Sequence, residues 1–136
     1  MSPPSAIALV QSYYDAFNRR DWPAMVALLS EDVAHDINQG HRETGREAFR
    51  DFLLGMDRSY RERLVDVVVM ASADGSRAAA EYTVEGVYRS TQPGLPEARD
   101  QPYRLGGGAF FEIHDGRITR VSSHYNLGAW LAQVGS

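Results

Sequence analysis

Apolar residues recur at helical spacing near the start of the chain. Ile7, Val10, Tyr14 and Phe17 follow one another at intervals of three and four residues, which places them on one stripe of a helix. Polar residues occupy the positions between them. The pattern predicts an amphipathic helix over about 5–19 that packs through this stripe.

Two further helices are predicted in the first half of the chain. Asp21 is a suitable N-cap for a short helix over about 21–29. A T-x-x-E capping box that begins at Thr44 predicts the start of a helix over about 45–57. The weak alternation over 33–37, between these helices, predicts a short strand.

The second half of the chain reads as strands joined by tight turns. The dipeptides Asp74-Gly75 and Asp115-Gly116 are hairpin signals, so the strands that they join must run antiparallel. The strands are predicted over about 61–72, 77–90, 102–114 and 117–127, with a short C-terminal cap around Trp130. The fold class is therefore α+β, with three amphipathic helices on one face of an antiparallel sheet. If that sheet is curved, it would enclose a pocket between the two layers.

Composition and charge narrow the class of protein. The chain has 136 residues, which suits a single domain over 1–136, and a net charge of −4, which argues against a nucleic-acid partner. Cysteine and lysine are both absent, which excludes disulfides, thiol nucleophiles and Schiff-base chemistry. The sequence has no signal-peptide pattern and no apolar stretch long enough for a membrane, so we expect a cytoplasmic protein.

The strand over 33–37 carries the titratable side chains of greatest interest. His35 shares the parity of the apolar residues Val33 and Ile37, so it should face inward, where it could act as a general acid or base near neutral pH. The alternative is a buried histidine satisfied by a hydrogen bond. Asp36 should face outward, and only a shift of the strand register would make it the base in the pocket.

Aromatic and apolar residues of inward parity are predicted to line a pocket. Tyr13 lies at the edge of the helical stripe, where its phenol can point into a cavity, although aromatic residues at helical spacing also form core. The predicted lining consists of Phe17, Ile37, Tyr82, Val84, Ala109, Phe111 and Tyr125. The glycine run 106–108 suggests a bulge, a bend or space for a ligand. The isolated histidines lack metal-ligand spacing, so no metal is expected.

The outer face of the sheet is also apolar in places. Phe110 lies on the face opposite Phe111, and valines occupy both faces of the strand over 64–70. A sheet that is apolar on both sides should be covered on both sides. We therefore expect a homodimer formed through the outer face.

The order of these elements, with their residues, resembles the nuclear-transport-factor-2-like superfamily, and most closely its ketosteroid-isomerase-related and SnoaL-like proteins. The resemblance is carried by VQSYYDAFN at 10–18, DWPAM at 21–25, LLSEDV at 28–33, GREAF at 45–49 and FFEIHDGRI at 110–118. It implies a cystatin-like (SnoaL-like) α+β roll, in which a cone-shaped, curved antiparallel sheet is wrapped on three N-terminal helices. It also implies an apolar pocket open at one end and a dimer formed through the outer face of the sheet.

The isomerases of this superfamily use a pocket aspartate as base, with a helix-one tyrosine and a protonated strand aspartic acid as oxyanion donors. The tyrosine corresponds to Tyr13. The base corresponds to Ile37, next to Asp36, and the acid falls near Ala109, which cannot donate. A proton acceptor of inward parity is then needed, and His35 is the titratable residue in that strand with this parity.

Two functions follow from the resemblance and the residues together. The first is a cofactor-free isomerase or cyclase that moves a proton next to the carbonyl of a small apolar molecule, such as a steroid or polyketide. The second is a binding or dimer-scaffold domain of the same fold, without catalysis. An epoxide hydrolase would need an Asp–Arg–Asp set in the pocket, which the inward positions do not supply.

Overall fold

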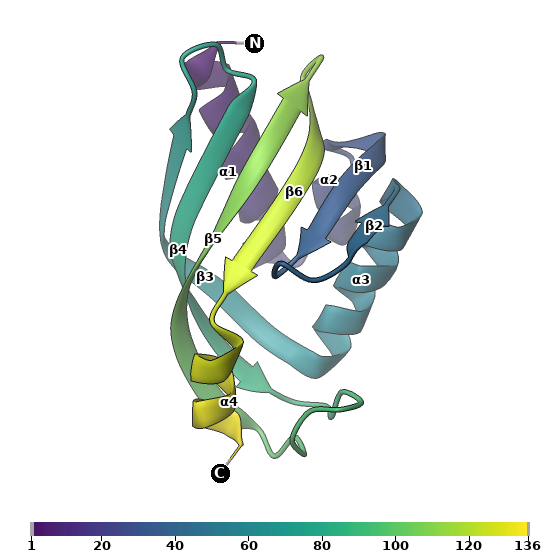
Figure 1. Ribbon diagram of the computed structural model, residues 1–136, viewed down its shortest axis with the longest axis vertical. Helices are drawn as coiled ribbons and strands as arrows, with labels where there is room; N and C mark the ends of the chain where they lie inside the picture. Colours follow the sequence, from purple (N-terminus) through teal and green to yellow (C-terminus); the bar gives the residue numbers. More distant parts are fainter. Residues whose placement is uncertain (1, 136) are drawn as a thin grey trace.

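The structure is a computed structural model that describes residues 2–135 (Figure 1). Its helices are α1 (Pro3–Arg19), α2 (Trp22–Val26), α3 (Arg46–Ser59) and α4 (Leu127–Val134). Its strands are β1 (Leu29–Ile37), β2 (Arg42–Thr44), β3 (Tyr60–Ala71), β4 (Arg77–Tyr88), β5 (Gln101–His114) and β6 (Arg117–Tyr125). Among these residues, no helix is both long enough and apolar enough to cross a bilayer.

The six strands form one curved sheet in the order β2-β1-β6-β5-β4-β3. Helices α1, α2 and α3 lie on one side of this sheet, and α4 lies at the end where β5 begins (Figure 1). The α+β class and the sheet wrapped on three helices are confirmed. The sheet is not wholly antiparallel, however, because β1 runs parallel to β6.

Several predicted boundaries in the first half are wrong, and strand pairing explains why. The second helix ends at Val26 rather than near 29, because Leu29 already pairs with Ile118 of β6. This pairing extends β1 beyond the predicted 33–37. The short strand β2, which the sequence did not suggest, pairs with the other edge of β1.

Of the two predicted helix N-caps, one is confirmed and one is wrong. The Asp21 carboxylate accepts a hydrogen bond of 3.1 Å from the backbone N–H of Ala24, as predicted for an N-cap. The capping box at Thr44 does not form. Thr44 belongs to β2, and Gly45 is the N-cap of α3, with no side-chain hydrogen bond to the helix.

The hairpin between β5 and β6 turns through Asp115 and Gly116, both of which have positive φ. That backbone is the one that a two-residue hairpin of this twist requires, and it explains the Asp-Gly sequence. The glycine run 106–108 forms no bulge, because β4 and β5 pair without interruption through it. The absence of a side chain at Gly107 instead accommodates the ring of Tyr82, which lies opposite it.

Strand β3 contains a bulge that reverses which residues face inward. Asp66 has a φ of 53°, and the pairing with β4 is interrupted between Val65 and Val68. Leu64 is buried before the bulge, whereas Val68 is 54% exposed after it. Figure 1 shows the change of direction in this strand. The two halves of β3 therefore face different surroundings.

The carboxamide of Asn18 at the end of α1 binds the backbone of Leu64 twice. It donates to the Leu64 carbonyl at 2.9 Å and accepts from the Leu64 N–H at 2.9 Å. These bonds satisfy both backbone groups on the open edge of β3, as a neighbouring strand would. They also fix the end of α1 against the first half of β3.

Candidate functional site

A cavity of about 50 Å³ lies where the ends of α1 and α2 meet α3 and the first residues of β3. Its walls are mostly apolar and aromatic, with one basic and one acidic side chain. The lining residues are Phe17, Arg20, Trp22, Phe52, Leu53, Met56, Tyr60 and Glu62. Apolar walls with a few polar groups are typical of small-molecule sites, but the volume is well below that of a usual ligand pocket.

Glu62 is held by a tyrosine that reaches it across an intervening strand. The Tyr103 hydroxyl of β5 donates a hydrogen bond of 2.5 Å to Oε2 of Glu62 on β3. Between them lies Gly86 of β4, which pairs with Glu62 on one side and with Tyr103 on the other. A Cβ atom at Gly86 would overlap the ring of Tyr103 at Cζ. The glycine therefore gives the ring its path to the carboxylate.

Burial raises the pKa of the Glu62 carboxyl, and the hydrogen bond from Tyr103 offsets only part of this effect. Among residues 2–135, no arginine or histidine lies within ion-pair distance of Glu62. A carboxyl group with a raised pKa and no cationic partner is a candidate for general acid–base work.

Four tyrosines lie within electrostatic reach of Glu62. Burial is the main cause that raises the pKa of each neighbouring phenol, and the nearby charge of Glu62 adds to it. The four tyrosines affected in this way are Tyr60, Tyr82, Tyr103 and Tyr125. Neutral phenols remain hydrogen-bond donors, but the Tyr103 hydroxyl already donates to Glu62, and the Tyr60 hydroxyl donates to Gln92 at 3.0 Å. Tyr60 is the one of the four that lines the cavity, so it could stabilise an oxyanion there only by exchanging Gln92 for the new acceptor.

Helix α4 supports the Glu62 side from outside the cavity. Trp130 packs edge-on against Tyr103, with ring centroids 6.0 Å apart, and against Tyr88 at 5.0 Å. The Tyr88 hydroxyl in turn donates to the Pro96 carbonyl at 2.7 Å in the loop between β4 and β5. This aromatic cluster fixes the ring of Tyr103, and hence its hydroxyl.

His35 faces inward but lies in the core beneath α3, where it packs against the lining residue Phe52 without itself lining the cavity. Only 3% of its surface is exposed, and its ring packs 4.4 Å from that of Phe49 and 4.7 Å from that of Phe52. Its Nδ1 has no hydrogen-bond partner. Burial lowers the pKa of His35 to about 4, so the imidazole is neutral at pH 7.

Asp36 lies on the outer face, as the parity of β1 predicts. Its carboxylate accepts hydrogen bonds from Arg42 at 2.6 Å and from Arg120 at 3.3 Å. The bond from Arg42 is the main cause that lowers the pKa of Asp36, and Arg120 adds to it. Asp36 is thus a paired surface anion, and it lies outside the cavity.

Tyr13 is enclosed by other aromatic rings. It packs edge-on against Tyr14 at 5.0 Å and against Phe111 at 5.5 Å. Burial raises the pKa of Tyr13 far above its usual value. The rings of Tyr13 and His35 both contact Phe49. Both side chains therefore belong to the core, and neither lines the cavity.

The predicted lining residues are divided between cavity, core and surface. Phe17 lines the cavity. Tyr82 and Tyr125 lie within electrostatic reach of Glu62, and Tyr125 is 43% exposed. Ile37 is half-buried beside β6. The remaining members are buried in the core: Val84, Ala109 and Phe111.

Sequence reasoning missed Glu62, although a signal was present. Tyr60, Glu62 and Leu64 share one parity, and Leu64 is apolar. The valine-rich run after Leu64 hid this alternation, because the bulge at Asp66 places apolar residues on both faces. The contribution of Tyr103 could not be inferred at all, because it depends on the register across three strands.

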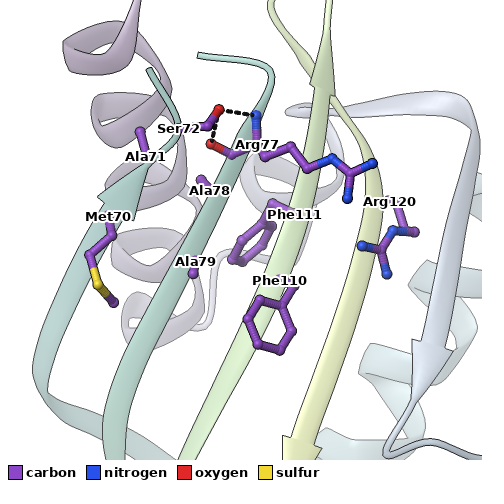
Figure 2. Close-up of a pocket in the computed structure, with 9 residues that line it drawn as sticks. All are labelled: Met70, Ala71, Ser72, Arg77, Ala78, Ala79, Phe110, Phe111 and Arg120. Atoms are coloured by element: carbon purple, nitrogen blue, oxygen red, sulfur yellow. Dashed lines mark hydrogen bonds between the residues drawn. The ribbon is translucent and has the colours of Figure 1, made fainter. Parts of the chain in front are cut away.

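A larger hollow of about 270 Å³ lies on the outer face of the sheet (Figure 2). Figure 2 shows Phe110 and Met70 beside it, with Arg77 and Arg120 at the rim. Both arginines pair with Glu112, at 3.1 and 3.3 Å. Its charges are therefore neutralised within the protein, and it offers no unpaired acid or base.

No group of three or more acidic or histidine side chains within residues 2–135 is placed to hold a metal ion. The side chains at the cavity instead suit an organic molecule. A curved sheet wrapped on three helices, with such a cavity between the layers, is the nuclear-transport-factor-2-like fold.

The chain belongs to the SnoaL-like domain family, whose model matches residues 10–121. Two solved structures, each named a putative polyketide cyclase, are similar over nearly all of it. The protein from Xanthomonas campestris pv. campestris is 59% identical, with 96% of this chain and 97% of that chain covered and a TM-score of 0.94. The protein from Silicibacter sp. TM1040 is 47% identical, with 100% and 99% covered and a TM-score of 0.96.

A more distant structure shares only the fold. The LEH-like epoxide hydrolase of M. tuberculosis is 17% identical, with 97% of this chain and 86% of that chain covered and a TM-score of 0.73. A search of curated proteins found no match to the chain.

Gly86→Ala should destabilise the fold by about 1–3 kcal/mol, because the new methyl group would overlap the Tyr103 ring. Urea unfolding measures this loss. Gly106→Ala is the matched control, since a Cβ there meets nothing within 4 Å. Combining Gly86→Ala with Tyr103→Ala should cost less than the sum of the two changes. Equal stabilities of the two alanine variants at 86 and 106 would contradict the assignment.

His35 should make the protein sensitive to acid. The unfolded chain takes up this proton near pH 6.5 and the folded protein only near pH 4, so stability falls as the pH drops between these values. The full loss amounts to about 3 kcal/mol. Urea unfolding at several pH values should show a shallower dependence in His35→Gln, whereas His114→Gln, at an exposed histidine, should behave like the parent chain. Parallel pH profiles for His35→Gln and the parent would contradict the assignment.

Proposed function

We propose that the protein catalyses cofactor-free proton transfer next to the carbonyl of a small, largely apolar molecule, with Glu62 as the proton acceptor. The observation that carries the proposal is the Glu62 carboxyl itself: it lines the cavity, has a raised pKa and is oriented by Tyr103. The likeness to proteins named polyketide cyclases supports a substrate of polyketide or steroid type.

The proton transfer uses the free oxygen of Glu62. Tyr103 occupies Oε2, so Oε1 takes a proton from the carbon next to the substrate carbonyl. The electrons of the broken C–H bond form an enolate, whose oxygen accepts a hydrogen bond from a neighbouring tyrosine hydroxyl. Glu62 then returns the proton to the same carbon or to a conjugated one, which restores the enzyme. Isomerisation or ring closure follows from the enolate.

The alternative is a binding domain without turnover. It is favoured by Ala109, which stands near the position of the isomerases' strand acid and cannot donate a hydrogen bond. For either function, the cavity of about 50 Å³ holds no more than a few water molecules unless the walls move. Met56 is the flexible wall residue whose rotamer change could enlarge the cavity for a ligand. Ligand binding without proton exchange would identify this second function.

We also propose a homodimer through the outer sheet face. Three large apolar side chains are exposed there on β3 and β5: Val68, Met70 and Phe110. Phe110 is 53% exposed and borders the hollow of Figure 2. Burial of this surface against a second copy would remove it from water, and the ion pairs at its rim would remain satisfied.

Glu62→Gln should abolish catalysed proton exchange. The probe is 2-tetralone in D₂O, whose protons next to the carbonyl are replaced by deuterium, as followed by NMR. We expect the parent chain to accelerate this exchange and Glu62→Gln to lower the rate by about 10²–10⁴-fold, because the general base is lost. The rate in the parent chain should fall on the acid side as Glu62 takes up a proton.

Two variants control this experiment. Glu85→Gln changes a glutamate that pairs with Arg104 on the outer face, and it should leave the exchange unchanged. His35→Gln should also retain it, because His35 lies outside the cavity lining. Exchange that survives Glu62→Gln but is lost in His35→Gln would overturn the role of Glu62 in favour of His35. Binding of 2-tetralone without exchange in the parent chain would overturn catalysis.

Phe110→Glu should convert the dimer to a monomer, because a charge at the centre of an apolar interface is costly to bury. Light scattering coupled to size exclusion measures the mass at micromolar concentration. Leu54→Glu is the control, since Leu54 is an exposed apolar residue on α3. A parent chain that is monomeric at this concentration would remove the proposal.

A further inference from the structure

The cavity that contains Glu62 has a basic side chain in its opposite wall. Arg20 follows α1 directly and lines the same cavity as Trp22 and Glu62. Its guanidinium carbon lies 5.8 Å from the centre of the Trp22 ring, a cation–π arrangement that fixes the side chain. About a quarter of the Arg20 side chain is exposed, so the group can still be reached from solvent.

Arg20 belongs to a group of cations with few counter-charges. Its carboxylate partner is Asp57 of α3. Burial is the main cause that lowers the pKa of Arg20, and the charges of Arg61 and Arg89 add to it. Within residues 2–135, neither Arg61 nor Arg89 has a carboxylate at ion-pair distance. Positive charge is therefore in excess at this side of the cavity.

The backbone at Arg20 gives no reason for an arginine. Arg20 has a φ of 59°, a left-handed conformation that caps α1 and that glycine or asparagine adopts more readily. The same cap could be made without a charged side chain. The long basic side chain is accounted for by its position over Trp22 at the cavity wall.

Arg20 and Glu62 do not form an ion pair with each other, so the cavity has both a cationic group and a separate acid–base group. Asp57 and Trp22 hold Arg20, while Tyr103 holds Glu62. Glu62 keeps its raised pKa, as it would not beside an arginine. A ligand that fills the cavity meets an acid–base group at one wall and a guanidinium fork at the other.

We propose that the ligand of this cavity carries a carboxylate, or a chemically equivalent anionic group, which Arg20 binds while its carbonyl end lies at Glu62. This inference rests on the proposed function for the position of the carbonyl, but the anion site itself does not depend on catalysis. Arginine suits the role because its planar fork binds a carboxylate through two parallel hydrogen bonds. Phe17 and Trp22, whose rings pack edge-on at 5.7 Å, provide an apolar wall for the rest of the ligand.

The test compares an acid with its neutral ester. The probes are 2-tetralone-6-carboxylate and its methyl ester, and binding is measured by calorimetry or NMR titration. The parent chain should bind the acid at least about tenfold more tightly than the ester. Arg20→Asn, which suits the left-handed backbone, should reduce binding of the acid by about tenfold and leave binding of the ester unchanged.

Two further variants make the result specific. Arg19→Asn removes a neighbouring, well-exposed arginine and should leave the preference for the acid intact. Asp57→Asn removes the competing carboxylate, so it should maintain or strengthen binding of the acid. No preference for the acid in the parent chain would overturn the inference. An equal loss for acid and ester in Arg20→Asn would also overturn it, since the arginine would then be structural.

The same probes separate this inference from the proposed function. Glu62→Gln should still bind the acid in preference to the ester, even though it no longer exchanges protons. Acid-selective binding without exchange in the parent chain would therefore support Arg20 while removing catalysis. Exchange without acid selectivity would do the reverse.

Discussion

The two hydrogen bonds between the Asn18 carboxamide and the Leu64 backbone determine the geometry on which the candidate site depends. They join the end of α1 to the open edge of β3 just before the bulge at Asp66. Beyond the bulge, β3 turns its other face inward. This connection brings Phe17 and Arg20 at the end of α1 to the same cavity as Tyr60 and Glu62 at the start of β3.

A row of three paired residues across β3, β4 and β5 orients the acid of the candidate site. Glu62, Gly86 and Tyr103 are neighbours in register, and the missing side chain in the middle lets the outer two meet. A larger residue at the central position would separate them. The aromatic contacts of Trp130 then hold Tyr103 from the far side, so a helix that lies outside the cavity takes part in orienting its acid.

Carboxylates on the two faces of the sheet have opposite properties for a physical reason. On the outer face, Asp36 and Glu112 lie among arginines in a row of ion pairs, which keeps Asp36 charged well below neutral pH. On the inner face, Glu62 accepts a hydrogen bond from a tyrosine and, within residues 2–135, forms no ion pair, so burial raises its pKa. The same kind of side chain is a structural anion on one face and a candidate base on the other.

Local periodicity and turn chemistry were enough to predict the α+β class and the inward and outward parity of β1, and the resemblance to a known family added the cone-shaped architecture. Asp21 and Asp115-Gly116 could be interpreted without a structure, since a cap and a tight turn involve neighbouring residues. The candidate site, in contrast, depends on tertiary packing and strand register. His35 satisfied every local criterion for a base, yet the helix packed over it makes it core. Glu62 and its partner Tyr103 are 41 residues apart, and their meeting depends on strand register, on a bulge and on a glycine between them. Their contact became visible only in three dimensions, because side chains from separate strands meet through pairing rather than through proximity in sequence.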